Sequence, residues 1–253
     1  MSTLLLRLAA PLQAWGTDSK FNRRTTNREP TKSGVIGLSA AALGCGRDDS
    51  VEELSELRFA VRIDQAGKLM KDFHTAHTFG KKKQAAFISD RYYLADAVFL
   101  AGLEGPRDLL EKIEAALQNP VFPLSLGRRS CPPTEPLVLG IVEKPLLDAL
   151  REAPWHASDW YKTGQPENVH LEIVRDADFG EPGSFERRDL PLSFSQRHRQ
   201  YAFRSVFSDM RAVSVENELA ARARTGEASA DDRMRTEHDP FGGLEVEDVS
   251  IQG

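Results

Sequence analysis

The stretch Leu4-Leu5-Leu6-Arg7-Leu8-Ala9-Ala10 decides the fold, because it reads as a mostly buried strand that Pro11 ends. A helix with a broad apolar face is predicted over residues 31–43, stopped by Gly44. Further strands are predicted at 59–63, 92–103 and 137–142, and an amphipathic helix at 107–117. The order strand, helix, strand, strand, helix, strand is that of the split βαβ, ferredoxin-like (RRM-like) α+β fold.

The remaining segments do not belong to this six-element unit. Residues 65–90 are rich in Lys, His, Thr and Gly with isolated aromatics, which favours an exposed hairpin over core. Beyond residue 145 the pattern weakens, although short strands are expected near 170–174, 184–189 and 197–204. We therefore expect a ferredoxin-like domain over 1–145 with 65–90 as a projecting arm, a small C-terminal β region over 146–216, and a charged, mobile tail over 217–253.

Charge distribution, rather than net charge, indicates the kind of partner. The formal net charge is −5, but residues 218–253 carry nine acidic and four basic residues, so the rest of the chain is neutral overall. Cys45 and Cys131 form no CxxC pair, which excludes a thiolate zinc finger and a disulfide scaffold. No apolar run approaches membrane-spanning length, and no nucleotide-hydrolysis or hydride-cofactor motif occurs, so we expect a cytoplasmic protein without cofactor or metal.

Two basic loops point to a nucleic acid. The first is Leu126-Gly127-Arg128-Arg129-Ser130-Cys131-Pro132-Pro133, in which glycine and prolines shape a loop bearing two guanidiniums that suit phosphates. A bland surface turn closed by salt bridges is the alternative. The second loop carries Lys20, Arg23, Arg24, Arg28 and Lys32. Lys32, Ser33 and Gly34 stand where the first helix should begin, and a helix N-terminus is a phosphate site.

Histidines and aromatics extend this interpretation. His74 and His77, followed by Lys81 to Lys83, fit a basic arm, a metal site or a metal-independent ribonuclease centre; no carboxylate or thiolate completes a metal set. The basic arm is the favoured reading. Most aromatics belong in the core, but Trp15 and one of Tyr92 and Tyr93 are predicted to be exposed for stacking on bases.

Five segments together resemble the CasD family of type I-E CRISPR Cascade subunits, within the repeat-associated RNA-binding superfamily. They are LRLAAPLQAWG at 6–16, REPTKSGVIGLSAAALGCGRDD at 28–49, KDFHT at 71–75, RYYLADA at 91–97 and LGRRSCPPTEPLVLG at 126–140. The resemblance covers residues 1 to about 140. It implies a ferredoxin-like domain with a thumb at 65–90, and Arg91 matches a thumb-base arginine.

The resemblance also implies a role in antiviral defence. Such a subunit grips the 5′ handle of the CRISPR RNA, caps the row of CasC subunits and lies beside the large subunit CasA, without catalytic residues. In a related subtype the equivalent subunit cuts the repeat RNA, so a metal-independent endoribonuclease using His74 or His77 with a lysine is the alternative. The residues expected to contact RNA are Lys20, Arg23, Arg24, Arg28, Lys32, Ser33, Gly34, His74, Arg91, Tyr92, Gly127, Arg128, Arg129, Ser130 and Cys131.

Overall fold

The structure is a computed structural model that describes residues 1–16, 23–76, 87–134 and 136–220. The predicted Lys20, His77 and lysines 81–83 and the tail from residue 221 lie outside these described residues. The strands are β1 Ser2–Ala9, β2 Leu12–Gln13, β3 Arg23–Arg24, β4 Arg58–Gln65, β5 Lys68–Ala76, β6 Phe87–Ala95, β7 Val98–Gly105, β8 Val138–Val142, β9 Asn168–Asp176, β10 Phe185–Ser193 and β11 Gln200–Glu216. The helices are α1 Lys32–Leu43, α2 Glu52–Ser55, α3 Arg107–Gln118, α4 Leu146–Glu152 and α5 Asp159–Thr163.

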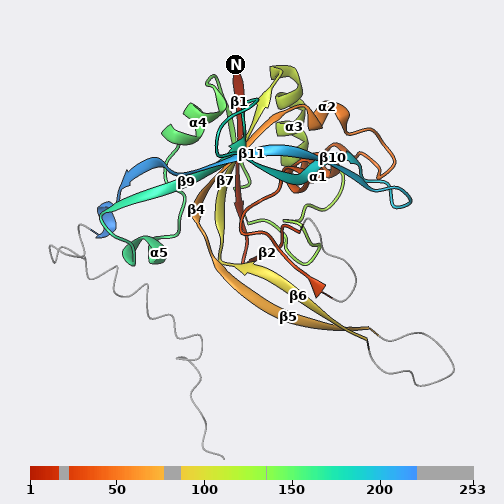
Figure 1. Ribbon diagram of the computed structural model, residues 1–253, viewed down its shortest axis with the longest axis horizontal. Coiled ribbons are helices and arrows are strands. Elements are labelled where there is room, and N and C mark those ends of the chain that lie inside the picture. The colour runs from red at the N-terminus through yellow and green to blue at the C-terminus, as the bar shows by residue number, and fades with distance from the viewer. Residues whose placement is uncertain (17–22, 77–86, 135, 221–253) are drawn as a thin grey trace, which may run out of the picture.

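A seven-stranded sheet in the order β10-β11-β9-β4-β7-β1-β8 forms the body of the protein (Figure 1). Within it, β8, β1, β7 and β4 pair antiparallel, and α1 and α3 follow β1 and β7 in the chain. This is the split βαβ arrangement, so the predicted ferredoxin-like α+β fold is confirmed. The sequence analysis set residues 146–216 apart as a small C-terminal β region, but the strands of this region, β9 to β11, extend the same sheet because β9 pairs with β4.

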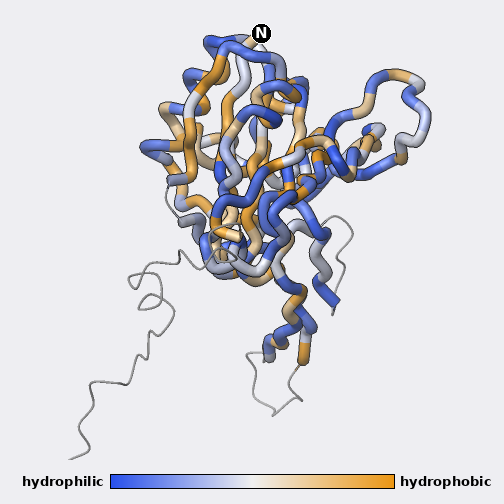
Figure 2. The backbone as a smooth tube through the Cα atoms, turned by 90° about the vertical axis from the view of Figure 1, so that its left-hand side faces the viewer, coloured by the Kyte–Doolittle hydropathy of each residue, from blue (hydrophilic) through white to orange (hydrophobic). Residues whose placement is uncertain are grey.

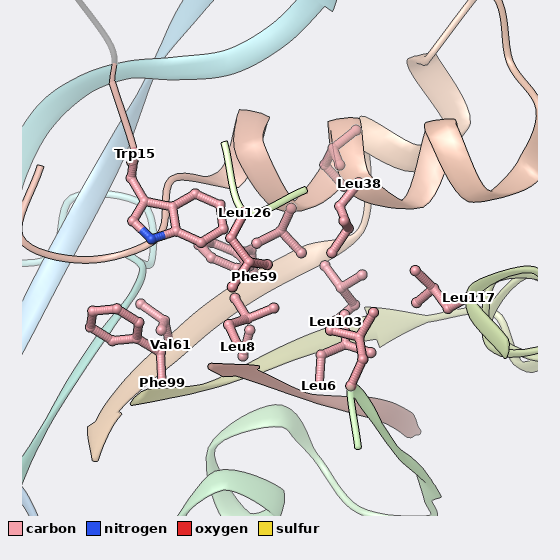
Figure 3. Close-up of a cluster of buried hydrophobic side chains, with 14 of the residues drawn as sticks. Leu6, Leu8, Trp15, Leu38, Phe59, Val61, Phe99, Leu103, Leu117 and Leu126 are labelled. Atoms are coloured by element: carbon pink, nitrogen blue, oxygen red, sulfur yellow. The ribbon is translucent and has the colours of Figure 1, made fainter. Parts of the chain in front are cut away.

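Both faces of the sheet are covered by apolar side chains. Leu4, Leu6 and Leu8 of β1 alternate with Leu5, because successive strand residues point to opposite faces. The three leucines pack in the large cluster that includes α1 and α3 residues such as Leu38 and Leu117 (Figure 3). Leu5 lies in a second cluster with three buried residues of α4: Leu146, Ala149 and Leu150.

The region after α4 is fixed by a buried arginine. Arg62 is fully buried and donates to the carbonyl oxygens of Leu150, at 2.5 Å, and Ala153, at 2.7 Å, while its Nε lies 2.6 Å from Asp64. A cation is stabilised at the carbonyl end of a helix, and Asp64 compensates its charge. This pair therefore joins α4 to the central sheet.

The predicted strand 92–103 is two strands. Asp96 has a φ of 55°, in the left-handed region, and separates β6 from β7. Only β7 belongs to the seven-stranded sheet; β6 pairs with β2, β3 and β5 in a second, four-stranded sheet. The prediction was wrong at this point because the apolar run continues across the turn and hides it.

The second sheet carries a long hairpin. β5 and β6 pair antiparallel over nine residue pairs, from Lys68↔Ala95 to Ala76↔Phe87. The hairpin leaves the body as a slender projection (Figures 1 and 2). None of the helices in the described part of the chain combines the length and the apolarity needed to span a bilayer.

Candidate nucleic-acid interface

The candidate interface lies at the root of the hairpin, where the loop 126–131 meets β3 and β6. Leu126 N–H donates to Cys131 O at 2.7 Å, and Cys131 N–H donates to Arg128 O at 2.9 Å, so the loop closes on itself. Ala14 N–H donates to Leu126 O at 3.1 Å and holds the loop against the chain that follows β2. The loop is therefore a shaped structure and not a free surface turn.

Gly127 is required for this close approach. Its φ is +87°, and a Cβ at this position would lie 1.6 Å from the carbonyl oxygen of Ala14. Any side chain would therefore be both strained and in collision. The glycine of the basic motif thus serves packing, and it places the two following arginines at the margin of the body.

Arg128 joins the loop to the hairpin root. Its Cζ lies 4.4 Å from the centroid of the Tyr93 ring, and its Nη2 donates to Arg24 O at 2.8 Å. A guanidinium over an aromatic face is attracted by the ring quadrupole. Arg128 is half-buried, whereas Arg129 is exposed, so the two neighbouring arginines have different surroundings.

The Tyr93 phenol is the centre of this arrangement. Burial raises the pKa of Tyr93, but hydrogen bonds from Arg128 and Ser130, the Arg128 charge and a hydrogen bond from Arg91 outweigh burial and hold the pKa below its ordinary value. Tyr93 is buried and belongs to the core, while Tyr92 is half-exposed. Arg23 lies over the Tyr92 ring, with its Cζ 5.2 Å from the centroid.

Positive charge gathers here without matching carboxylates. Among the described residues, no salt bridge reaches the arginines of this group, which are Arg23, Arg24, Arg91, Arg128 and Arg129. Asp90 pairs instead with Lys71 at 3.0 Å. Asp72 stands opposite Arg91 in the ladder without forming a salt bridge with it. We call the five arginines, Arg23, Arg24, Arg91, Arg128 and Arg129, the arginine cluster.

Two donors of the cluster are buried and unpaired. Arg91 Nε and Arg128 Nη1 are inaccessible to solvent and have no hydrogen-bond partner among the described residues. A buried donor of a charged group that lacks an acceptor costs at least about 1–3 kcal/mol. An anionic oxygen would satisfy such donors, and a phosphate has the required charge and geometry.

The helix-start residues are placed differently from the prediction. Lys32 is buried: its Nζ pairs with Asp176 at 3.1 Å, and its backbone N–H donates to Asp189 at 3.0 Å. Burial lowers the pKa of the Lys32 ammonium, although Asp176 opposes the shift. Asp189, which also holds Arg204, thus occupies the place at the α1 N-terminus where a phosphate was expected.

Other predicted contacts are also internal. Ser33 Oγ lies 3.3 Å from Thr31 Oγ1, and a Cβ on Gly34 would lie 2.7 Å from the Trp15 ring. Cys131 is buried in the core, with 1% exposure.

Three other predicted contact residues lie on the surface. Arg28, Ser130 and His74 are exposed, and His74 lies on β5 of the hairpin.

Trp15 was predicted to be an exposed stacking residue, and this is wrong. Only 1% of it is exposed, and its Nε1 donates to Gln13 Oε1 at 3.0 Å. Figure 3 shows the indole beside Leu126 within the core. Among the described residues, no group of His, Cys, Asp and Glu side chains is arranged to hold a metal ion.

A four-stranded sheet like that of β8, β1, β7 and β4 is the framework of RRM-type nucleic-acid-binding domains, and a cluster of arginines on one side is the electrostatic footprint of such binding. The chain belongs to the Cas5 family: the family model described as "CRISPR-associated protein (Cas_Cas5)" matches residues 3–207. The resemblance drawn from the sequence motifs is thereby confirmed.

Individual relatives agree with this assignment. The chain is 39% identical over 158 residues to "CRISPR system Cascade subunit CasD" of Escherichia coli (strain K12), which covers 55% of this chain and 70% of that protein. It superimposes on a chain of a "CRISPR RNA-guided surveillance complex" with a TM-score of 0.72 at 32% identity, covering 86% of this chain and 92% of that one. A structure titled "Crystal structure of Cas protein" matches with a TM-score of 0.65 at 40% identity, covering 86% and 96%.

Proposed function

We propose that this protein is the RNA-binding subunit of a type I-E CRISPR Cascade complex that grips the 5′ handle of the CRISPR RNA and does not cut it. The arginine cluster carries the proposal, because it combines five cations that lack described salt bridges with two buried, unpaired donors. The names of the relatives, a Cascade subunit and a chain of an RNA-guided complex, support the same assignment.

The arginines of the cluster have different roles in this proposal. Arg24 and Arg129 are exposed and bind phosphates, whereas Arg128 positions the loop over Tyr93. The half-exposed Tyr92 presents a ring beside them for a splayed base. Lys32 and Cys131 have no part in binding, because both are buried within the body.

The test is the salt dependence of handle RNA binding. Each of Arg24→Gln and Arg129→Gln should lower the slope of log K against log salt by about 0.7–1, because one phosphate contact is lost. Arg151→Gln is the matched control, since Arg151 is an exposed arginine on α4 with only a 3.9 Å contact to Asp148. Equal slopes for all three variants would show that the cluster does not bind the handle.

Cleavage is tested in the same assay. The full chain should leave a labelled repeat RNA intact in EDTA and in magnesium while it binds the handle more tightly than a scrambled RNA. A discrete cut upstream of the handle, abolished by His74→Ala, would instead make the protein an endoribonuclease. His74 is the first residue to change because it is exposed on the hairpin.

We further propose that the hairpin docks on the neighbouring CasC backbone subunit, with CasA as the other neighbour. Leu69, Phe73 and Ile88 are 67%, 64% and 56% exposed. The ladder register places them on one face. Leu69, Phe73 and Thr75 are separated by even numbers of residues in β5 and so share a face, and Ile88 of β6 stands opposite Thr75. Apolar side chains in such an exposed row favour a protein partner.

Double substitution tests this contact. Leu69→Ser with Phe73→Ser should reduce co-purification with CasC while the melting temperature stays near that of the unsubstituted chain, because both side chains are already exposed. Met210→Ser is the control, since Met210 is 66% exposed on β11. Undiminished co-purification of the double variant would refute hairpin docking.

A further inference from the structure

The β10–β11 hairpin ends in a second basic surface, separate from the arginine cluster. Arg197, His198 and Arg199 lie in the turn between the two strands, and Arg188 lies further back on β10; all four are exposed. In the described part of the chain, none of the three arginines has a carboxylate within salt-bridge distance. We call these four residues the hairpin tip. In Figure 1 the tip extends away from the body beyond α1, whereas the β5–β6 hairpin leaves in another direction.

The base of this hairpin is rigid. Arg204 of β11 is buried and donates to Asp189 at 2.7 and 3.0 Å and to Asp176 at 2.6 Å. Arg187 forms a 2.5 Å salt bridge with Glu29, so its charge, like that of Arg204, is neutralised inside the structure. These contacts hold the strands without using any residue of the tip.

The loop itself is also shaped. The Phe194 ring packs edge-on against Tyr201, with centroids 6.4 Å apart, and it lies 3.5 Å from where a Cβ on Gly37 of α1 would be. Ser193 Oγ accepts from Ser195 N–H at 3.2 Å, and Ser195 Oγ accepts from Arg197 N–H at 3.3 Å. The tip therefore presents its cations from a defined backbone.

Arg188 is directed toward the same end. Its Nε donates to Tyr201 O at 3.3 Å, which brings the guanidinium toward the turn, and within the described part of the chain its other donors have no hydrogen-bond partner, so they can meet a ligand. Phe203, two residues further along β11, is 62% exposed. Exposed arginines beside an exposed aromatic ring match the chemistry of single-stranded nucleic acid, in which phosphates meet cations and bases stack on rings.

We propose that the hairpin tip binds a second single-stranded nucleic acid segment, without regard to sequence, with its phosphates at Arg188, Arg197 and Arg199 and a base on Phe203. The proposal goes beyond handle binding, because it concerns another surface and another strand. Affinity there depends on charge and stacking, and neither selects a sequence.

The experiment uses the full chain and a mixed-sequence single-stranded DNA that lacks the handle. Replacement of Arg188, Arg197 and Arg199 by Gln should lower the slope of log K against log salt by about 2, because each single-strand contact contributes about 0.7. The control variant replaces three exposed, ion-paired basic residues elsewhere, namely Arg107, Lys144 and Arg151, and changes the net charge equally.

A second variant separates stacking from charge. Phe203→Ser should weaken binding of the DNA about tenfold and leave the salt slope unchanged, because a ring carries no counterion effect. Both variants should bind handle RNA with the affinity of the unsubstituted chain, whereas Arg129→Gln should weaken handle binding alone. Failure at the tip and failure at the arginine cluster are thus distinguishable.

Two results would overturn the proposal directly. In the first, the triple variant has the same slope of log K against log salt as its control variant. In the second, the unsubstituted chain does not bind the DNA at low salt. If the triple variant keeps DNA binding but loses co-purification with other Cascade subunits, the tip is a protein-binding surface and the nucleic-acid assignment is wrong.

Discussion

Gly127→Ala should be far more damaging than the addition of a single methyl group suggests. The alanine Cβ would be placed 1.6 Å from Ala14 O, and φ is +87°. The left-handed conformation costs about 1–2 kcal/mol for alanine. Relief of the collision must separate the loop from Ala14, and breaking the buried bond from Ala14 N–H to Leu126 O adds about 1–3 kcal/mol. We expect a total loss of about 2–5 kcal/mol in the free energy of unfolding.

Gly180→Ala is the matched control, because it isolates the conformational cost. Gly180 has a similar φ of +73°, but nothing lies within 4 Å of where its Cβ would be. It should lose only about 1–2 kcal/mol. Urea unfolding of the three proteins, analysed at equal slope, measures both losses. If the two variants lose the same free energy, close approach of the loop to Ala14 is not what requires glycine at position 127.

Two further predictions concern charges. Asp64→Ala leaves the fully buried Arg62 without its carboxylate, so the free energy of unfolding, measured by urea titration, should fall by about 3–5 kcal/mol. The control Asp148→Ala, which removes an exposed ion pair, should lower it by less than about 0.5 kcal/mol. Equal losses in the two variants would contradict the buried-pair interpretation. The lowered pKa of Tyr93 means that the folded state favours its phenolate. The phenolate therefore adds to the free energy of unfolding above the pKa of about 10 that tyrosine has in the unfolded chain, and this contribution is lost as the pH falls through the lower pKa of Tyr93 in the folded state. Ultraviolet titration, with Tyr93→Phe to identify the phenol, should show this pKa rising in Arg128→Gln, and an unchanged pKa would sink the assigned contact.

The order of elements could be predicted because it depends on local patterns. The amphipathic helix predicted at 107–117 is α3, and the helix predicted at 31–43 is α1, preceded by Thr31 as its N-cap. These signals come from residues close together in the chain. The break at Asp96 could not be found in this way, because both of its flanks are apolar strands with the same pattern.

The site was only partly predictable because burial depends on distant residues. Lys32 and Arg129 look alike in sequence, but Asp176 and Asp189 arrive from strands more than a hundred residues away and enclose the lysine. Trp15 appears exposed because it stands next to Gly16 at the start of a predicted loop, yet its ring packs against Gly34. Arg91 was found only through family resemblance, and its unpaired Nε has no signal in the sequence.

Gln13 has a mechanical consequence for the hairpin. Its Nε2 donates to Leu8 O of β1 and to Ala97 O before β7, while its Oε1 accepts from the indole of Trp15. One buried amide thus links the root of the projecting hairpin to the central sheet through hydrogen bonds. A force on the hairpin therefore acts on β1 and on the chain before β7 through the Gln13 side chain. Amide protons near Leu94 should exchange only when the whole domain opens, and a neighbouring subunit must adjust to a fixed arm.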